Sequence, residues 1–193
     1  MTKKYFNYHK GYTLIELLAV MAILITVGTI IAGIIVSSLR GSNRSKNVGN
    51  VRQAGNTVLV QMSKTIKFAK SFDGISINET NYVTDCIVPV TIPIPTPIPY
   101  KYLKLTSSDD TQTIFACKEG SVFSNTDELI DQTNLTGFSI PTASCYFICS
   151  QTNIAVPPTI SINFTVSTVD PTSAFAENRV SLDFKTSAAF RNN

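Results

Sequence analysis

The dominant feature of the hydrophobic pattern is an uncharged run from Leu17 to Leu39, dense in Leu, Ile, Val and Ala. At about 1.5 Å per residue, a helix over this run is about 35 Å long, which is enough to cross a bilayer. A cleaved secretory signal has a shorter apolar core followed by small residues, and the sequence around Arg40 fits that pattern poorly. We therefore predict one retained membrane helix.

Beyond the run, apolar or small residues recur every three or four positions. After a weak point at Gly41–Asn43, they are Val48, Val51, Gly55, Val58, Met62, Ile66, Ala69 and Phe72. This is the spacing of a helix with one apolar face. It predicts that residues 40–73 continue the helix and pack that face on a folded domain.

The pattern changes at Asp73–Gly74, and short runs of Thr, Val, Ile, Phe and Tyr follow, broken by Asn, Pro, Asp and Gly. Such runs indicate strands. We predict them at Tyr102–Leu105, Thr113–Cys117, Phe138–Ile140, Cys145–Ile148, Thr159–Val166 and Val180–Phe184. The fold class is α+β, with a long N-terminal helix on an antiparallel β-sheet head over residues 74–193. The proline-rich segment Ile92–Pro99 is expected to be a stiff polyproline II spacer.

Charge changes this picture little. The formal net charge is +3, but Lys3, Lys4 and Lys10 lie in the first eleven residues, where there is no acid. Without that stretch the basic and acidic side chains balance, so net charge does not predict a nucleic-acid partner.

The four cysteines, Cys86, Cys117, Cys145 and Cys149, all follow the apolar run. An even number there suits an oxidising compartment, so we expect disulfides and an extracytoplasmic head. If residues 145–149 are extended, their ends are beyond disulfide reach and each pairs with Cys86 or Cys117. If they turn, Cys145 can pair with Cys149. Separate buried thiols are the alternative; a zinc site is not expected, since no histidine lies nearby.

The block from Lys10 to Leu18 reads Lys-Gly-Tyr-Thr-Leu-Ile-Glu-Leu-Leu. It resembles the processing site of type IV prepilins and type II secretion pseudopilins, in which a basic leader ends in glycine and a glutamate lies within the apolar segment. The resemblance implies a leader over residues 1–11, a membrane half of the helix over 12–39, and a prepilin peptidase that cuts between Gly11 and Tyr12 and N-methylates Tyr12. It also implies assembly with other pilin or pseudopilin subunits through Glu16.

Glu16 is chemically unusual where it stands. A carboxylate inside a membrane helix costs about 2.5–3.5 kcal/mol, so it needs a partner. Cleavage after Gly11 would supply one, because the new amine of Tyr12 is a cation at the same end of the helix. A carboxylate that simply reaches the aqueous interface is the alternative.

The expected function is therefore a structural filament subunit of a pilus, competence or type II secretion machine. The head is similar to those of minor pilins and J-type minor pseudopilins, and Glu16 argues against the K-type tip subunit. The alternatives are a surface-displayed adhesin or DNA-uptake module, and an unrelated signal-anchored membrane protein or enzyme. We expect no catalysis, because the single histidine, His9, lies in the leader. We also expect no cofactor, metal or small-molecule substrate.

Overall fold

The fold is described by a computed structural model that covers residues 11–87, 97–130, 138–153, 155–168 and 179–190. Most of the predicted leader and most of the proline-rich segment lie outside these residues. The chain divides into two compact units, Met1–Asn43 and Arg44–Asn193. Each is described separately below.

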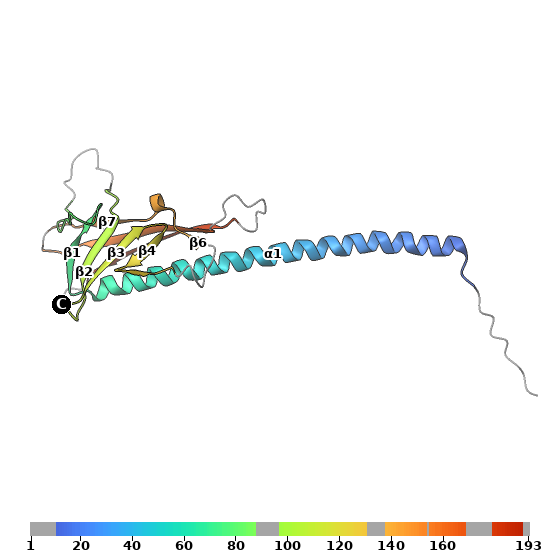
Figure 1. The fold of residues 1–193 in the computed structure, drawn as a ribbon, viewed down its shortest axis with the longest axis horizontal. Helices are drawn as coiled ribbons and strands as arrows, with labels where there is room; N and C mark the ends of the chain where they lie inside the picture. Colours follow the sequence, from blue (N-terminus) through green and yellow to red (C-terminus); the bar gives the residue numbers. More distant parts are fainter. Residues whose placement is uncertain (1–10, 88–96, 131–137, 154, 169–178, 191–193) are drawn as a thin grey trace, which may run out of the picture. The chain divides into compact units, whose positions relative to one another are not determined.

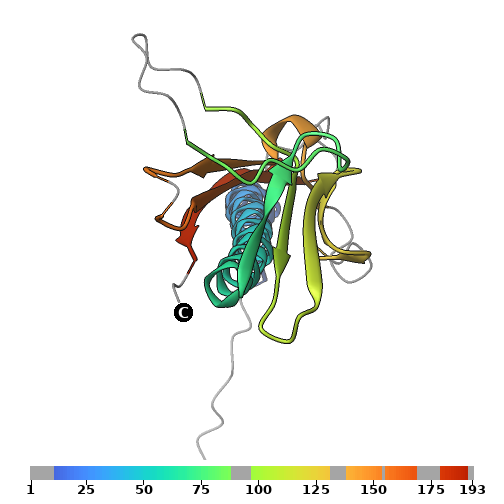
Figure 2. The ribbon, with the colours of Figure 1, turned by 90° about the vertical axis from the view of Figure 1, so that its left-hand side faces the viewer.

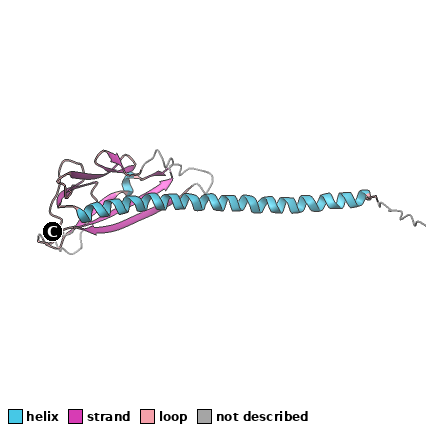
Figure 3. Ribbon diagram, turned by 90° about the horizontal axis from the view of Figure 1, so that it is seen from below, coloured by secondary structure: helices cyan, strands magenta, loops and turns pink. Residues whose placement is uncertain are grey.

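Helix α1 (Leu14–Phe68) runs through both units and is drawn as a cyan coil in Figure 3. In the first unit its large apolar side chains are exposed, from Leu14 to Leu39. An apolar surface of this extent needs a non-aqueous environment. By length and composition, α1 can cross a membrane.

In the second unit, α1 has the predicted apolar face. Its buried residues are Val51, Ala54, Gly55, Val58, Met62 and Ile66. They recur at helical spacing and enter a hydrophobic core together with residues of two β-sheets. In Figure 2, this part of α1 lies between the sheets. The predicted α+β fold is confirmed.

The helix ends earlier than the predicted limit of residue 73. It stops at Phe68, and strand β1 (Ser71–Ser76) begins three residues later. The amide of Lys70 donates to the Thr106 carbonyl at 2.8 Å, so the backbone has already joined the sheet. The apolar spacing that continues through Ala69 and Phe72 was misleading, because strand pairing with a segment 30 residues away decides the structure here.

The first sheet has the order β1-β2-β3-β4-β5 and is antiparallel throughout. After β1 come β2 (Tyr102–Thr106), β3 (Gln112–Lys118), β4 (Ser121–Ser124) and β5 (Asp127–Glu128). Glu119 and Gly120 join β3 to β4 with φ of 51° and 76°. Positive φ at both positions is the geometry of a tight hairpin turn. Figure 1 labels most of these strands.

The second sheet contains β6 (Phe138–Ser139), β7 (Tyr146–Ser150), β8 (Thr159–Thr168) and β9 (Ser181–Ala189). Strand β8 is central, with β9 along one edge and both β6 and β7 along the other. The 3₁₀-helix η1 (Thr142–Ser144) lies between β6 and β7. Each predicted strand overlaps an observed one, whereas β1, β4 and β5 were not predicted.

Candidate functional site

The predicted cleavage site lies just before the first turn of α1. Gly11, Tyr12 and Thr13 have no regular secondary structure, and the helix begins at Leu14. The Tyr12 side chain is 84% exposed. A Cβ built on Gly11 would meet nothing within 4 Å. The peptide bond between Gly11 and Tyr12 therefore joins two exposed residues outside the helix, as suits a peptidase substrate.

Thr13 caps the helix. Its hydroxyl oxygen accepts a hydrogen bond from the Glu16 amide at 3.3 Å, and its carbonyl accepts from the amides of Glu16 and Leu17 at 3.1 and 3.2 Å. A threonine followed three residues later by glutamate is the sequence signature of a capping box. This role of Thr13 was not predicted, although the Thr-x-x-Glu signature is present in the sequence.

The cap fixes the position of Glu16. This residue is in the first turn of α1 and is exposed. A negative side chain in the first turn is stabilised by the positive end of the helix dipole. Around it, Leu14, Ile15, Leu17 and Leu18 are exposed apolar side chains. The carboxylate is thus an isolated charge on an otherwise apolar helix end.

Gly11 and Tyr12 therefore lie just before α1, five and four residues ahead of Glu16 along the chain. An α-amine created on Tyr12 would stand four residues before Glu16. The cysteines belong to the second unit and have no part in this site.

The cysteines form two disulfides, Cys86–Cys149 and Cys117–Cys145, with Cα–Cα distances of 5.5 and 5.6 Å. Strand β7 is extended, so the structure has the first of the two pairings considered from the sequence. Lys101 also contacts the residues next to the Cys117–Cys145 disulfide, since its ammonium group donates hydrogen bonds to the carbonyl oxygens of Thr142 and Cys145. Burial lowers the pKa of Lys101.

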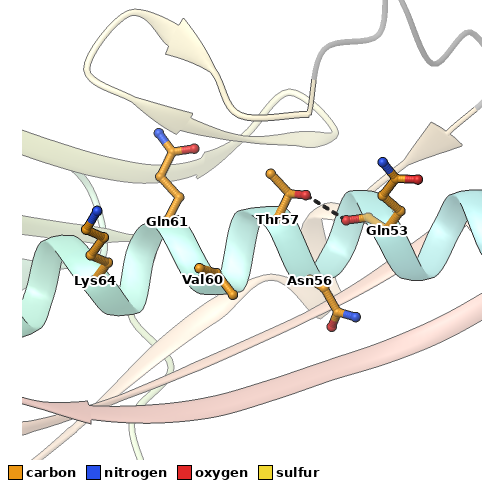
Figure 4. Close-up of a pocket in the computed structure, with 6 residues that line it drawn as sticks. All are labelled: Gln53, Asn56, Thr57, Val60, Gln61 and Lys64. Atoms are coloured by element: carbon orange, nitrogen blue, oxygen red, sulfur yellow. Dashed lines mark hydrogen bonds between the residues drawn. The ribbon is translucent and has the colours of Figure 1, made fainter.

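Six exposed residues of α1, five of them polar, line a pocket in the second unit. Figure 4 shows them, and they are Gln53, Asn56, Thr57, Val60, Gln61 and Lys64. The Thr57 hydroxyl donates to the Gln53 carbonyl at 2.9 Å, within the helix itself. Among the described residues, no group of three or more His, Cys, Asp and Glu side chains could hold a metal ion.

Comparison with known families gives one match. Residues 6–36 match the model of the prokaryotic N-terminal methylation motif. No curated protein and no solved structure matches the chain. The match contains Gly11, Tyr12, Thr13 and Glu16, and it supports the resemblance to the type IV pilin-like family. The motif indicates a prepilin-type precursor, and the chain has an apolar helix suited to a membrane anchor and a disulfide-bonded head.

Proposed function

We propose that this protein is a minor pilin or pseudopilin, a structural subunit of a type IV pilus, competence or type II secretion filament. Prepilin peptidase cuts between Gly11 and Tyr12, and the new N-terminus of Tyr12 is methylated. The head lies on the extracytoplasmic side, and the subunit enters the filament through the membrane half of α1. The role is structural and not catalytic.

The observation that carries this proposal is the single carboxylate in a capped first turn. Glu16 lies in the capped first turn of α1, four residues after Tyr12, among exposed apolar side chains. In a membrane, such a carboxylate is costly without a cation nearby. The methylated amine of Tyr12 in a neighbouring subunit would supply that cation, so pairing would select both the partner and its register. A buried ion pair contributes more to specificity than to stability.

Intact-mass spectrometry of the protein from its native membrane tests the processing step. We expect a chain that begins at Tyr12 and carries one added methyl group. A full-length, unmethylated chain would refute the proposal. The same sample also reports the disulfides, because reducing two of them adds four hydrogens to the mass.

The substitution Glu16→Val tests the assembly step. We expect normal membrane insertion, since valine lowers the free-energy cost of placing the helix in the membrane. We also expect loss of incorporation into filaments, measured by shearing and immunoblotting. Thr57→Val is the matched control, because Thr57 is exposed on α1 outside the motif and bonds only within the helix. Normal incorporation of Glu16→Val would show that the carboxylate does not direct assembly.

A further inference from the structure

The second sheet has a gap in its edge. Strand β7 pairs with residues 159–163 of β8, and β6 pairs with residues 167 and 168. Between these segments, residues 164–166 of β8 have a ladder partner only on β9 in the part of the chain that the structure describes. The chain between β6 and β7 leaves the sheet here to form η1. A cavity of about 420 Å³ lies at this gap, which is within the usual size range of small-ligand sites.

Strand alternation decides which side chains line the cavity. Phe164 and Phe184 are buried on the face that packs toward α1, with ring centroids 5.4 Å apart. Their neighbours along each strand point to the opposite face. The residues that line the cavity are Phe164, Phe184, Ser144 of η1 and, on that opposite face, Tyr146, Asn163, Thr165, Asp183 and Lys185.

The register sets these groups in two rows. Asn163 lies opposite Tyr146 on one side and opposite Lys185 on the other. In the next row, the Thr165 hydroxyl donates to one Asp183 carboxylate oxygen at 2.7 Å. Directly opposite residues have Cβ atoms about 4.5–5.5 Å apart. An aromatic ring, an amide, an ammonium group and a carboxylate thus surround one small space.

Asn163 is the informative member. It is only 8% exposed, and its side-chain nitrogen has no hydrogen-bond partner among the described residues. A buried donor without a partner costs about 1–3 kcal/mol, and an apolar residue at this central strand position would avoid that cost. The donor is thus unused by the described part of the protein, and its residue lies in the wall of the cavity.

The lining indicates what that group is. Asn163 and Lys185 donate hydrogen bonds, whereas Asp183 accepts them, so the complementary group both donates and accepts within a short distance. Hydroxyl groups do both. The half-buried ring of Tyr146 offers an apolar surface beside these polar groups. A sugar ring combines several hydroxyl groups with an apolar C–H face, and it fits a cavity of this size.

We infer that this cavity binds a carbohydrate, so that the head carries a sugar-recognition site on the face of the β7–β8–β9 sheet turned away from α1. The inference goes beyond the structural role proposed above. It is compatible with that role, because a face turned away from α1 stays accessible when α1 packs against neighbouring subunits.

The test uses the oxidised full chain in detergent, applied to an array of immobilised glucose, galactose, mannose, N-acetylglucosamine and sialic-acid oligosaccharides. We expect retention on at least one sugar, and competition by the same sugar in solution. Asn163→Ala and Tyr146→Ala should each weaken binding about tenfold or more, as expected from loss of a hydrogen bond or of a stacking surface. Ser187→Ala, on the same face but outside the cavity, should bind as the unchanged protein does.

The thermal unfolding midpoint separates recognition from a structural role. Asn163→Ala removes a donor that has no partner, so its midpoint should not fall while binding is lost. Absence of binding to every sugar on the array, or equal binding by Asn163→Ala and Tyr146→Ala, would overturn the inference. Glu16→Val should bind sugar normally, which keeps this test independent of filament assembly.

Discussion

Thr13 determines where α1 begins. The first amides of a helix have no intrahelical acceptor, and at this end the threonine oxygens accept from the amides of Glu16 and Leu17. The same contacts orient the turn that carries the carboxylate. Thr13, which was not among the predicted site residues, therefore positions Glu16, which was.

The substitution Thr13→Ala should loosen this turn. Loss of an N-cap costs about 1 kcal/mol, so amide hydrogen exchange at Glu16 should accelerate about fivefold in the detergent-solubilised chain. Exchange measured by nuclear magnetic resonance reports this directly, and Thr13→Ser should retain the original rate. Unchanged exchange in the alanine variant would show that the cap does not stabilise the turn.

Tyr82 is a second residue whose polar atom lacks a partner. Its hydroxyl is buried without a hydrogen bond to any residue that the structure describes, and the Lys104 ammonium lies 5.6 Å from the ring centroid. Burial, and secondarily the charge of Glu79, raise the pKa of Tyr82 above its ordinary value of 10.0. The fold therefore favours the neutral phenol.

The sign of the resulting pH dependence follows from this shift. As pH rises above 10.0, the unfolded chain loses the Tyr82 proton before the folded chain does, so stability falls. Below that pH, Tyr82→Phe should be at least as stable as the unchanged protein. Above it, the variant should lose less stability, because it has no phenol to ionise. Urea unfolding on either side of 10.0 measures the difference, and an equal loss in both proteins would contradict the assignment.

At the scale of elements, α1 and β9 meet at one close contact in the second unit. A Cβ on Gly55 would lie 2.2 Å from the Phe184 ring, which is itself buried and stacked on Phe164. The absence of a side chain at position 55 is what lets the sheet approach the helix. Sequence spacing placed Gly55 on the apolar face but could not reveal its neighbour.

Gly55→Ala should therefore destabilise the head, because overpacking of this kind costs about 1–3 kcal/mol. Gly49→Ala is the matched control, since a Cβ there meets nothing within 4 Å and should gain about 1 kcal/mol from helix propensity. Urea unfolding followed by near-ultraviolet circular dichroism compares the two. Equal stabilisation by both substitutions would contradict the contact.

The sequence predicts elements well where the signal is local. The helical face from Val51 to Ile66 and strands such as β8 carry a clear period. The end of α1 and strand β1 were missed because Phe72 continues the helical spacing, whereas pairing with Leu105 decides its conformation. At the site, Gly11, Tyr12 and Glu16 were recognisable from the motif, but the cysteine pairing stayed open because it depends on the conformation of residues 145–149.

At the scale of the head, β7 is the point where the two sheets are joined. Cys149 within β7 is bonded to Cys86, and Cys145 just before β7 is bonded to Cys117 of β3. Phe147 also exchanges backbone hydrogen bonds with Tyr100 at 2.9 and 2.8 Å. These links join segments that are distant in sequence. The relative placement of the sheets thus depends on covalent bonds as well as on the core.

Removing either disulfide should destabilise the head. For sequence separations of 63 and 28, loop-closure entropy gives about 4 kcal/mol for each bond, with Cys86–Cys149 the larger. We expect lower urea midpoints for the paired substitutions Cys86→Ser with Cys149→Ser and Cys117→Ser with Cys145→Ser. Reductant should lower the midpoint of the unchanged protein further than that of either variant. An unchanged midpoint after reduction would contradict this role.

The Cys86–Cys149 bond also has a mechanical consequence. A tensile load applied between α1 and β8 follows the backbone from Phe68 to Cys86, crosses the disulfide to Cys149 and continues toward Thr159. The residues between the two cysteines are bypassed, so the load cannot draw them out while the bond is intact. The head can then lengthen only by the short stretches on either side, which limits its extension under shear.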